Sequence, residues 1–468
     1  MNDSPNQANQ PLYVLILAAG LGTRMKSRHA KVLHELGGRP LIAHVCRTAA
    51  LLNPQKIYVV VGYQADEVLR AAEKELGSGK VGFVNQPEQR GTGDAVLAAR
   101  TVLEDATATL LILSGDVPLI RAETLRALIE KHGTEKATCT MLTVRLENPS
   151  GYGRVVRDQD GNFVKIVEQR DASEEEREIR EVNAGIYCFE NQQLFAALPR
   201  VKPANKQGEY YLTDVPAIMR NDGETVGIFQ HRDAREVSGV NTRADLAEFE
   251  NLLRRGTIRR LMIDAGVTFI DPSHAYVSDE AELGRDCVLH PDVHIEGRSV
   301  IGEGCEIHQG SRIVNSRIGN RVMIKDHCLI VDSDIADDCA VGPFAHLRMN
   351  ATMEERAVVG NFVEVKKSRI GRGTKSMHLT YLGDATIGEN TNIGAGTVTC
   401  NYDGKEKHPT IIEDHVRIGS DTMLVAPVRV GSGAVTGAGS VVTEDVPPDT
   451  LVAGVPAKVK KKLKEDSK

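Results

Sequence analysis

A glycine-rich segment near the N-terminus combines an adaptable backbone with positive charge. Gly20 and Gly22 lie in the sequence LAAGLGTRM, which also contains Arg24, and Lys31 follows shortly afterwards. Glycines let a backbone approach a ligand closely and offer its N–H groups to phosphate oxygens, while arginine and lysine add cations. The segment is not a dinucleotide fingerprint, because Met25 occupies the place of the third glycine, and it lacks the GK[ST] ending of a P-loop. A tight turn would explain the glycines alone, but glycines and cations together predict a polyphosphate site.

Two further segments carry polar groups that suit a nucleotide. The side-chain amide of Gln86 offers a hydrogen-bond donor and an acceptor together, which suits the edge of a base, and the G-T-G sequence Gly91–Gly93 follows it. Asp116 lies in SGDVPL at the end of an apolar run, where a metal–phosphate complex would be bound. A surface glutamine and a turn-forming aspartate are the plain alternatives. The neighbouring G-T-G favours binding for Gln86, and both interpretations stay open for Asp116.

A second group of polar residues interrupts the aliphatic C-terminal half. Arg348, Lys366, His378 and Asn401 stand in segments that are richer in polar residues than those before them. Polar groups inside a regular aliphatic pattern are expected where something binds. An imidazole titrates near neutrality and can accept a proton. The chain has 14 histidines, and a lone histidine is usually structural or exposed, so His378 depends on its neighbours in HLTYLGD for a catalytic interpretation.

Alternating strands and helices position the first group. Apolar runs predict strands at Tyr13–Ala18, Lys56–Gly62 and Thr109–Ser114, a loop and then a helix over Lys31–Ala50, and a second helix over Asp66–Leu76. Near-continuous apolar strands separated by helices indicate a parallel sheet that is covered on both faces. Ligands of such sheets bind beyond the carboxyl ends of the strands. The glycine-rich segment and the predicted aspartate both follow strands in this way.

In the C-terminal half an aliphatic residue returns at almost every sixth position. The series is Ile295, Ile301, Ile307, Ile313, Ile318, Ile324, Ile330, Ile335 and Val341, and it resumes at Ile387, Ile393, Ile418, Leu424 and Val430. A period of six belongs neither to a helix nor to a plain strand. It predicts a coil in which three faces complete one turn and the aliphatic side chains stack inside. Residues four positions later are mostly small and suit the corners: Ser299, Cys305, Ser311, Val322, Cys328, Cys339 and Ala345. A β-sandwich, with spacings of about eight to twelve residues, fits less well.

Length and composition exclude several classes of protein. The chain has 468 residues, enough for two or three domains, and its net charge of -7 argues against a nucleic-acid binder. The basic segment Lys458–Lys464 is interpreted as a solvated end. The eight cysteines form no CxxC pair, so neither a disulfide framework nor a zinc site is indicated. Without a bilayer-length apolar run or a signal peptide, a cytoplasmic protein with no membrane contact is expected.

A helical arm is expected between the two halves. The sequence ADLAEFENLLRRGTIRRLMIDA has apolar residues at helical spacing, Asn241 or Thr242 can cap it, and Gly256 weakens its middle. The predicted organisation is a disordered N-terminus (1–11), an α/β domain (12–243), the helical arm (244–265), the coil (266–458) and a charged tail (459–468).

The first half resembles the sugar-nucleotide pyrophosphorylases. L-x-G-x-G-T-R-M followed by K-V-L is their signature, and NKQGEYYLTD and GVNTR are also characteristic; Ala30 departs from the proline usual in that family. The resemblance implies a Rossmann-like domain that transfers a uridylyl group from UTP to a sugar 1-phosphate. Arg24 and Lys31 would be its catalytic cations, and Asp116 and Asn241 its Mg²⁺ ligands. The residues implied for UTP and UDP-N-acetylglucosamine are Leu17, Ala18, Ala19, Gly20, Gly22, Thr23, Arg24, Lys31, Gln86, Gly91, Thr92, Ser114, Gly115, Asp116, Gly153, Glu168, Asn183 and Asn241.

The second half resembles the hexapeptide-repeat acyltransferases, which form left-handed parallel β-helices and act as trimers. GPFAHLR, GNFVEVKKS, HLTYLGDA and NIGAGTVTCNYDG are similar to segments of the bifunctional uridyltransferase–acetyltransferases, and the likeness runs from about Leu12 to Pro456. It implies acetyl transfer from acetyl-CoA to glucosamine-1-phosphate, then uridylyl transfer to N-acetylglucosamine-1-phosphate. The product would supply cell-wall and lipopolysaccharide precursors.

The same resemblance implies roles for residues of the coil. His378 would be the general base, and the site would lie between subunits of a homotrimer. The residues implied for the sugar phosphate are Arg348, Lys366, Tyr381 and Asn392, and those for acetyl-CoA are Ala395, Asn401, Tyr402, Ser420, Ala438 and Gly454. Gly454 departs from the family, which often has an arginine there, and Lys458 could substitute for it.

Two other functions stay open. A pyrophosphorylase could carry a coil that only trimerises or regulates it, although a pure scaffold has no need of His378 or of Asn401–Tyr402. A non-catalytic assembly platform is a third alternative, against which Lys31, Asp116 and Asn241 argue together.

Overall fold

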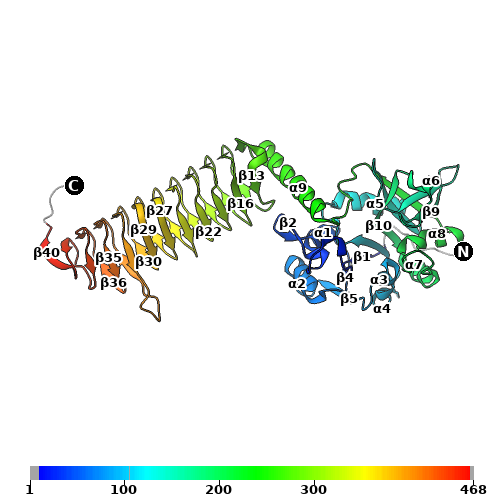
Figure 1. The fold of residues 1–468 in the computed structure, drawn as a ribbon, viewed down its shortest axis with the longest axis horizontal. Coiled ribbons are helices and arrows are strands. Elements are labelled where there is room, and N and C mark those ends of the chain that lie inside the picture. The colour runs from blue at the N-terminus through cyan, green and yellow to red at the C-terminus, as the bar shows by residue number, and fades with distance from the viewer. Residues whose placement is uncertain (1–9, 105, 464–468) are drawn as a thin grey trace. The chain divides into compact units, whose positions relative to one another are not determined.

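The structure is a computed structural model that describes residues 10–104 and 106–463. The chain forms two compact units, Met1–Glu250 and Asn251–Lys468 (Figure 1). The predicted disordered N-terminus lies outside the described residues except for its last two positions, and the final five positions of the predicted charged tail lie outside them as well.

A mixed β-sheet forms the centre of the first unit. Its strands follow the order β11-β7-β10-β6-β1-β4-β5. The strands are β1 (Leu12–Leu17), β4 (Lys56–Val61), β5 (Val81–Asn85), β6 (Thr109–Ser114), β7 (Cys139–Arg145), β10 (Glu181–Glu190) and β11 (Val226–His231), with β8 (Arg154–Arg157) and β9 (Phe163–Val167) beside β10. The predicted parallel pairing holds for β5, β4, β1 and β6. The prediction did not include β10, which runs antiparallel to β6 and β7.

Helices cover both faces of this sheet. They are α1 (Leu41–Ala50), α2 (Ala65–Leu76), α3 (Thr92–Ala98), α4 (Arg100–Leu103), α5 (Ala122–Thr134), α6 (Glu174–Arg177), α7 (Asn191–Ala197) and α8 (Val215–Asn221), and a small hairpin joins β2 (Glu35–Leu36) to β3 (Arg39–Pro40). Successive side chains of a strand point to opposite faces. Accordingly Val14 and Ile16 pack in one apolar cluster with α1, α2 and α5, whereas Leu15 packs in another with α3, α7 and α8. This two-sided burial explains why the strands are nearly continuous apolar runs.

A long helix, α9 (Arg243–Asp264), leaves the first unit and enters the second. Thr242 caps it: the Thr242 hydroxyl accepts the N–H of Asp245 at 3.1 Å, and the Asp245 carboxylate accepts the N–H groups of Thr242 and Asn241 at 2.9 Å each. Towards its other end Ile258 and Leu261 join the core of the second unit. The cap fixes the backbone of Asn241, one of the predicted metal ligands.

The second unit is a parallel β-helix (Figure 1). Two of its faces contain β12 (Thr268–Phe269), β13 (Ala275–Val277), β15 (Val288–Leu289), β16 (Val293–Glu296), β18 (Glu306–Ile307), β19 (Arg312–Val314), β21 (Met323–Ile324), β22 (Leu329–Val331), β24 (Ala340–Val341), β25 (His346–Arg348), β27 (Val358–Lys366), β29 (Lys375–Gly383), β31 (Asn392–Ile393), β32 (Val398–Cys400), β34 (Arg417–Ile418), β35 (Met423–Val425), β37 (Val435–Thr436), β38 (Val441–Val442), β39 (Thr450–Ala453) and β40 (Lys458–Lys462). The third face contains β14 (Glu282–Leu283), β17 (Val300–Ile301), β20 (Arg317–Ile318), β23 (Asp334–Ile335), β26 (Thr352–Met353), β28 (Arg369–Ile370), β30 (Ala385–Ile387), β33 (Thr410–Ile412) and β36 (Val428–Val430).

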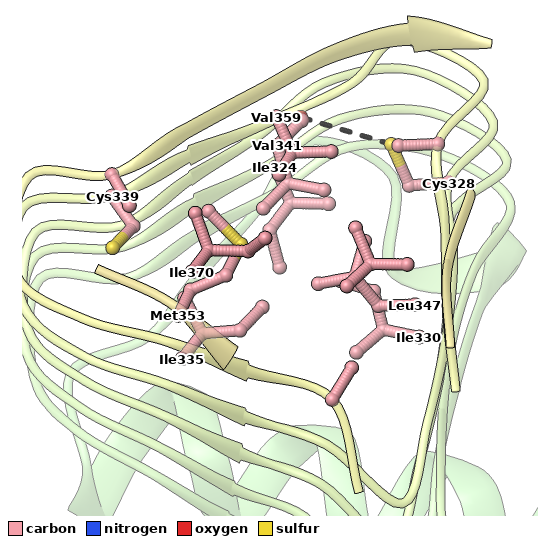
Figure 2. Close-up of a cluster of buried hydrophobic side chains, with 14 of the residues drawn as sticks. Ile324, Cys328, Ile330, Ile335, Cys339, Val341, Leu347, Met353, Val359 and Ile370 are labelled. Carbon is pink, nitrogen blue, oxygen red and sulfur yellow. Dashed lines mark hydrogen bonds between the residues drawn. The ribbon is translucent and has the colours of Figure 1, made fainter. Parts of the chain in front are cut away.

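The register confirms the prediction that three faces complete one turn. Ile295 pairs with Ile313, which pairs with Ile330. Each of these members of the aliphatic series is therefore stacked on the member three steps earlier in the series. Figure 2 shows the interior, where Ile324 and Val341 form one column and Ile330 lies in another. All members of the series are at most 2% exposed, and the small corner residues are equally buried. The aliphatic stack is therefore the core of the unit, and small corner side chains leave it room.

Three irregularities distinguish the second half of the coil. The strands β27 and β29 are much longer than their neighbours and pass around a corner of the coil. Further on, Ile387 pairs with Ile412, a longer turn than the preceding one, because the segment 401–409 projects as a loop between β32 and β33. At the end of the chain β40 turns back antiparallel to β39 with all its side chains exposed. These features fall in the part of the coil that carries the predicted polar residues.

Candidate active sites

A cavity of about 590 Å³ lies at the carboxyl ends of β1 and β6. It is lined by every residue predicted for the nucleotide and its sugar except Gly115. Gly115 lies behind the lining: its N–H donates to the carbonyl of Leu17 at 2.9 Å, and a Cβ there would lie 3.2 Å from Val32. The structure therefore brings this predicted site together from segments between Leu17 and Asn241, and Gly115 packs directly behind its lining.

Positive and negative side chains meet at one end of the cavity. The Lys31 ammonium contacts the carboxylate of Asp116 and lies 3.3 Å from Oδ1 of Asn241, to which the guanidinium of Arg24 also donates at 2.8 Å. The Ser114 hydroxyl donates to the other oxygen of Asp116 at 2.6 Å. A carboxylate and an amide oxygen thus converge on a cation, which is the kind of donor set that a hard divalent ion accepts.

Charge pairing keeps Asp116 ionised in a buried place. Burial alone would raise the pKa of this carboxyl group, but the Lys31 ammonium and the hydrogen bonds from Lys31 and Ser114 outweigh burial and hold the pKa below its usual range. The backbone carbonyl of Asp116 also accepts the N–H of Val240 at 2.9 Å. The carboxylate is therefore a fixed negative charge near neutral pH, positioned next to the segment that carries Asn241.

The glycine-rich loop needs glycine for a steric reason at one position. Gly22 has a φ of 61°, and a Cβ there would lie 2.5 Å from Cβ of Lys31. Arg24 follows in a short 3₁₀ turn, Thr23–Met25, whose Met25 side chain is buried. The close packing of Gly22 on Lys31 holds the two cationic segments side by side.

Gln86 is buried and already bonded within the protein. Its side-chain N–H₂ group donates to the carbonyl of Gly91 at 3.2 Å and to a carboxylate oxygen of Asp94 at 2.8 Å. Both donors of the amide are used, so its oxygen is the group left to face a ligand. In this structure Asp94 on α3 and the carbonyl of Gly91 engage the amide nitrogen, so only the amide oxygen is free, and the predicted pairing of Gln86 with a base stays a prediction.

The far end of the cavity holds a protonatable carboxyl group. Glu168 accepts a hydrogen bond from the Thr213 hydroxyl at 3.3 Å. Burial raises the pKa of Glu168, and the nearby carboxylates Asp171 and Asp214 raise it further. A Cβ on Gly153 would lie 3.1 Å from the carboxyl group of Glu168, so the glycine leaves that group open to the cavity.

Asn183 and Tyr187 form a rigid pair in the same wall. The Asn183 amide nitrogen donates to the Tyr187 hydroxyl at 2.6 Å, and the Asn183 oxygen accepts the N–H of Gly185 at 3.1 Å. Because the tyrosine oxygen accepts one bond, its own proton can be donated towards the cavity, which Tyr187 also lines. The sequence analysis missed Tyr187. Its position four residues after Asn183 in EVNAGIYC was the one signal in the sequence, but nothing local shows that β10 bulges there.

A second polar cluster lies on the coil where β25, β27 and β29 run side by side. Arg348 pairs with Glu364 at 2.6 Å, and Lys366, only 4% exposed, lies 3.2 Å from Asp384. The Asn401 amide nitrogen donates to the same Asp384 oxygen at 2.6 Å. Burial alone would raise the pKa of Asp384, but Lys366 and Asn401 hold it below its usual range. The cluster brings together three of the predicted residues and adds two carboxylates that the sequence analysis did not assign.

Tyr381 joins this cluster through a close approach at Gly383. A Cβ on Gly383 would lie 2.4 Å from the Tyr381 hydroxyl and 2.8 Å from the Asn401 amide nitrogen. The glycine therefore lets both polar groups occupy one place on the coil. Asn392 is exposed on the strand β31, beside Lys375 and Arg417, and Tyr402 is 60% exposed with its hydroxyl donating to the carbonyl of Gly404 at 2.8 Å.

His378 lies on an exposed corner of the coil, within β29. Its Nδ1 is 2.6 Å from Oδ1 of Asn361, which lies next to it on β27. An amide oxygen only accepts, so Nδ1 carries the proton and Nε2 is left as a basic nitrogen. The side chain is exposed on the surface of the coil. The imidazole therefore faces outward from this single chain.

The small residues predicted for acetyl-CoA stack at one corner of successive turns. The carbonyl of Ala395 accepts the N–H of Asp421 at 2.6 Å, and that of Ser420 accepts the N–H of Gly439 at 2.8 Å. Ala438 follows on the next turn, and the carbonyl of Gly454 accepts the N–H of Val441 at 3.0 Å. Lys458 pairs with Ala453 and so lies beside Gly454. The corner offers a narrow strip without bulky side chains that ends at a cation.

The described cysteines are free, and within the described residues no helix has the length and apolarity to cross a membrane. The sequence also resembles known protein families. The family described as "Nucleotidyl transferase" matches residues 13–238, "GMPPB C-terminal domain" matches 272–351, and "Bacterial transferase hexapeptide (six repeats)" matches 409–444.

Curated relatives match the chain over nearly its whole length. A "Bifunctional protein GlmU" from Heliobacterium modesticaldum is 50% identical and covers 93% of this chain and 94% of its own length. Proteins of the same name from Syntrophomonas wolfei and Geobacter metallireducens are each 47% identical, covering 94% and 97% of this chain and 96% and 99% of their own lengths.

Proposed function

The chain belongs to the family of bifunctional GlmU proteins, and from this we propose that it catalyses two successive transfers in the synthesis of UDP-N-acetylglucosamine. The coil transfers an acetyl group from acetyl-CoA to the amine of glucosamine-1-phosphate. The first unit then transfers a uridylyl group from UTP to N-acetylglucosamine-1-phosphate and releases pyrophosphate. The product is a precursor of the cell wall and of lipopolysaccharide.

In uridylyl transfer an oxygen of the sugar phosphate attacks the α-phosphorus of UTP, and the bond to the β-phosphate oxygen breaks. No protein nucleophile is required, so the protein acts by positioning its substrates and neutralising charge. Arg24 and Lys31 bind phosphate oxygens, and Lys31 exchanges its contact with Asp116 for the substrate. The Gln86 oxygen accepts the N–H of uracil, while Glu168, Asn183 and Gly153 bind the sugar.

Asp116 and Asn241 are the residues that would hold Mg²⁺. They fit the ion, because their two oxygens converge on the Lys31 ammonium, a positive charge that occupies the same neighbourhood. Bound there, Mg²⁺ would neutralise charge on the phosphates. Arg24 supports the arrangement from the other side, since its guanidinium donates to the Asn241 oxygen and orients the amide.

In acetyl transfer His378 removes a proton from the amine of glucosamine-1-phosphate as the nitrogen attacks the thioester carbon of acetyl-CoA; the new C–N bond forms, the C–S bond breaks, and coenzyme A leaves through its sulfur. Asn361 supports this role by holding the proton on Nδ1, so that Nε2 accepts the new one. Arg348, Lys366 and Tyr381 bind the sugar phosphate, with Asn392 beside them. The strip formed by Ala395, Ser420 and Ala438 accommodates acetyl-CoA, with Asn401, Tyr402 and Gly454 completing its site.

The coil carries this second site at an interface between three copies of the chain. The outward position of His378 supports the homotrimer, as does an exposed ladder of rings on the same corner. In that ladder the rings of His327 and Phe344 stack at 5.2 Å, and those of Phe344 and Phe362 at 5.3 Å. The free cysteines, UTP and acetyl-CoA suit a cytoplasmic enzyme.

The observation that carries the two-site proposal is the contact between His378 and Asn361, since a coil that only assembles subunits needs no oriented base. The test compares acetyl-CoA consumption with glucosamine-1-phosphate in the wild type and His378→Ala. We expect acetyl transfer to collapse in the variant while UDP-sugar synthesis from N-acetylglucosamine-1-phosphate persists. Absence of acetyl transfer in the wild type would favour the alternative, a pyrophosphorylase on a non-catalytic trimerising coil.

A further inference from the structure

Two imidazoles and one carboxylate converge near the beginning of the coil. His290 follows β15, Glu306 begins β18, and His308 follows it. Nε2 of His290 and Nε2 of His308 both lie 3.2 Å from Oε1 of Glu306. One ligand atom from each of the three residues lies within 4.8 Å of the other two. None of the three belongs to the sites described above.

The coil itself creates this convergence. Leu289 pairs with Ile307, so the residues that follow them, His290 and His308, occupy equivalent positions on successive turns. Glu306 and His308 flank the buried Ile307 and therefore project on the same side of their strand. Backbone bonds fix both histidines: the N–H of His290 donates to Ile307 at 2.9 Å, and that of His308 donates to Ile324 at 2.8 Å. The backbone that carries the three side chains is therefore held rigid by the hydrogen bonds of the coil.

The local contacts leave the cluster incomplete. His308 Nε2 is buried and makes no hydrogen bond, because the nearby Glu306 oxygen is not aligned with it. Its other nitrogen, Nδ1, lies 4.0 Å from a carboxylate oxygen of Asp326. A histidine that binds a metal usually donates its second ring N–H to such a carboxylate.

We propose that His290, Glu306 and His308 bind a divalent transition-metal cation of the zinc type. Two imidazole nitrogens and one carboxylate oxygen are ligands that Zn²⁺ accepts in fourfold coordination, with water in the fourth position. Mg²⁺ prefers oxygen ligands alone and does not compete here. The two rings stack at 4.6 Å with their planes 17° apart, so one ring turns about its broad χ2 torsion to direct its lone pair at the ion.

Such an ion would join two successive turns of the coil near its first strands. Every residue assigned to acetyl transfer lies later in the coil, from Arg348 onward, and the uridylyl site lies in the other unit. The ion therefore acts as a structural clamp that is independent of both transfers. Because it binds the folded coil only, it raises the melting temperature of that unit as its concentration increases.

The test titrates the full-length chain with ZnCl₂ by calorimetry after chelator treatment, in buffer that contains MgCl₂ to occupy the uridylyl site. The variants are His308→Gln and Glu306→Gln. His294→Gln is the matched control, because His294 lies on the neighbouring strand β16 with Glu296 at 4.0 Å, and its stacking partner is Tyr276 rather than a second histidine. Circular dichroism checks that each variant is folded.

We expect the wild type and His294→Gln to bind one more equivalent of Zn²⁺ than His308→Gln, and Glu306→Gln to bind that equivalent at least about 10-fold more weakly. Cobalt provides a second readout, since four-coordinate Co²⁺ absorbs visible light strongly. The wild type should show that absorption and His308→Gln should not. Equal zinc uptake in the wild type and His308→Gln, or an equal loss in His294→Gln, would overturn the proposal.

Discussion

Asn361 Oδ1 and His378 Nδ1 lie 2.6 Å apart, although 16 residues separate them in the chain. The parallel register of β27 and β29 places the two side chains next to each other on one corner of the coil. An amide oxygen cannot donate a proton, so the contact determines which ring nitrogen carries hydrogen and which one is basic. Asn361 is thus a positioning residue for the base.

Replacing Asn361 should impair acetyl transfer alone. We expect Asn361→Ala to lower kcat for acetyl transfer by about 10- to 100-fold, because the imidazole loses its preferred tautomer. Asn361→Asp keeps an acceptor, so it should retain activity. Its added carboxylate favours the protonated ring, and the acid limb of the pH–rate profile should move to higher pH. Unchanged acetyl transfer in Asn361→Ala would rule out this role, and uridylyl transfer serves as the internal control.

Lys31 should contribute to uridylyl transfer through its charge. Lys31→Met removes the cation that contacts Asp116 and should lower kcat by about 100-fold or more, since charge on the phosphates then goes unneutralised. Lys26→Met removes an exposed lysine of the same loop and is the matched control. Steady-state release of pyrophosphate measures both variants. Similar losses in the two would show that the general charge of the loop matters, and not the position of Lys31.

Glu168 should make the stability of the first unit depend on pH. Burial, followed by the charges of Asp171 and Asp214, raises its folded pKa above the ordinary value of 4.5. The folded protein then holds a proton that the unfolded chain has lost, so stability falls as the pH rises from about 4.5 through the folded pKa. Glu168→Gln removes this loss.

Thermal unfolding of the wild type and Glu168→Gln across that pH range measures the effect. The variant should gain in melting temperature relative to the wild type as the pH rises, and it should show no gain below pH 4.5. A difference that does not depend on pH would contradict the assignment. The same variant should raise KM for the sugar phosphate, because the amide replaces a carboxyl group that faces the cavity.

Lys458 should bind a phosphate of acetyl-CoA at the end of the small-residue strip. Its partner in the structure, Glu444, is exposed and 3.7 Å away, so the ammonium can be redirected to a ligand. We expect Lys458→Ala to raise KM for acetyl-CoA by about 3- to 10-fold with little change in kcat, because the variant loses one exposed charge-assisted contact with the ligand. Lys462→Ala, at the other end of β40, is the control.

A substrate without the 3′-phosphate of coenzyme A tests whether Lys458 binds that phosphate. Acetyl-dephospho-CoA lacks the 3′-phosphate, so the wild type should use it less well than acetyl-CoA, whereas Lys458→Ala should discriminate little between the two. If the variant discriminates as strongly as the wild type, then Lys458 does not bind that phosphate.

The sequence by itself determined the architecture of the coil and the location of the phosphate loop. The six-residue spacing predicts the coil, because each aliphatic residue of the series must point into the same interior whatever lies elsewhere in the chain. The stacking of Ile295 on Ile313 follows from that period alone. In the same way a run such as TLLILS identifies a buried strand, and glycines beside cations identify the loop after another strand.

Tertiary structure alone decided which polar groups meet. Arg24 and Asn241 are 217 positions apart, and the cap of α9 together with the bond between Val240 and Asp116 brings the amide to the guanidinium. Asp384 and Asn361 carry no local signal, because their partners lie on the next turn of the coil. The antiparallel direction of β10 and the hydrogen bond from the Gln86 amide to Asp94 likewise could not be predicted from the sequence. Periodicity depends on residues that are close in sequence. Hydrogen-bond partners depend on how segments that are distant in sequence pack against each other.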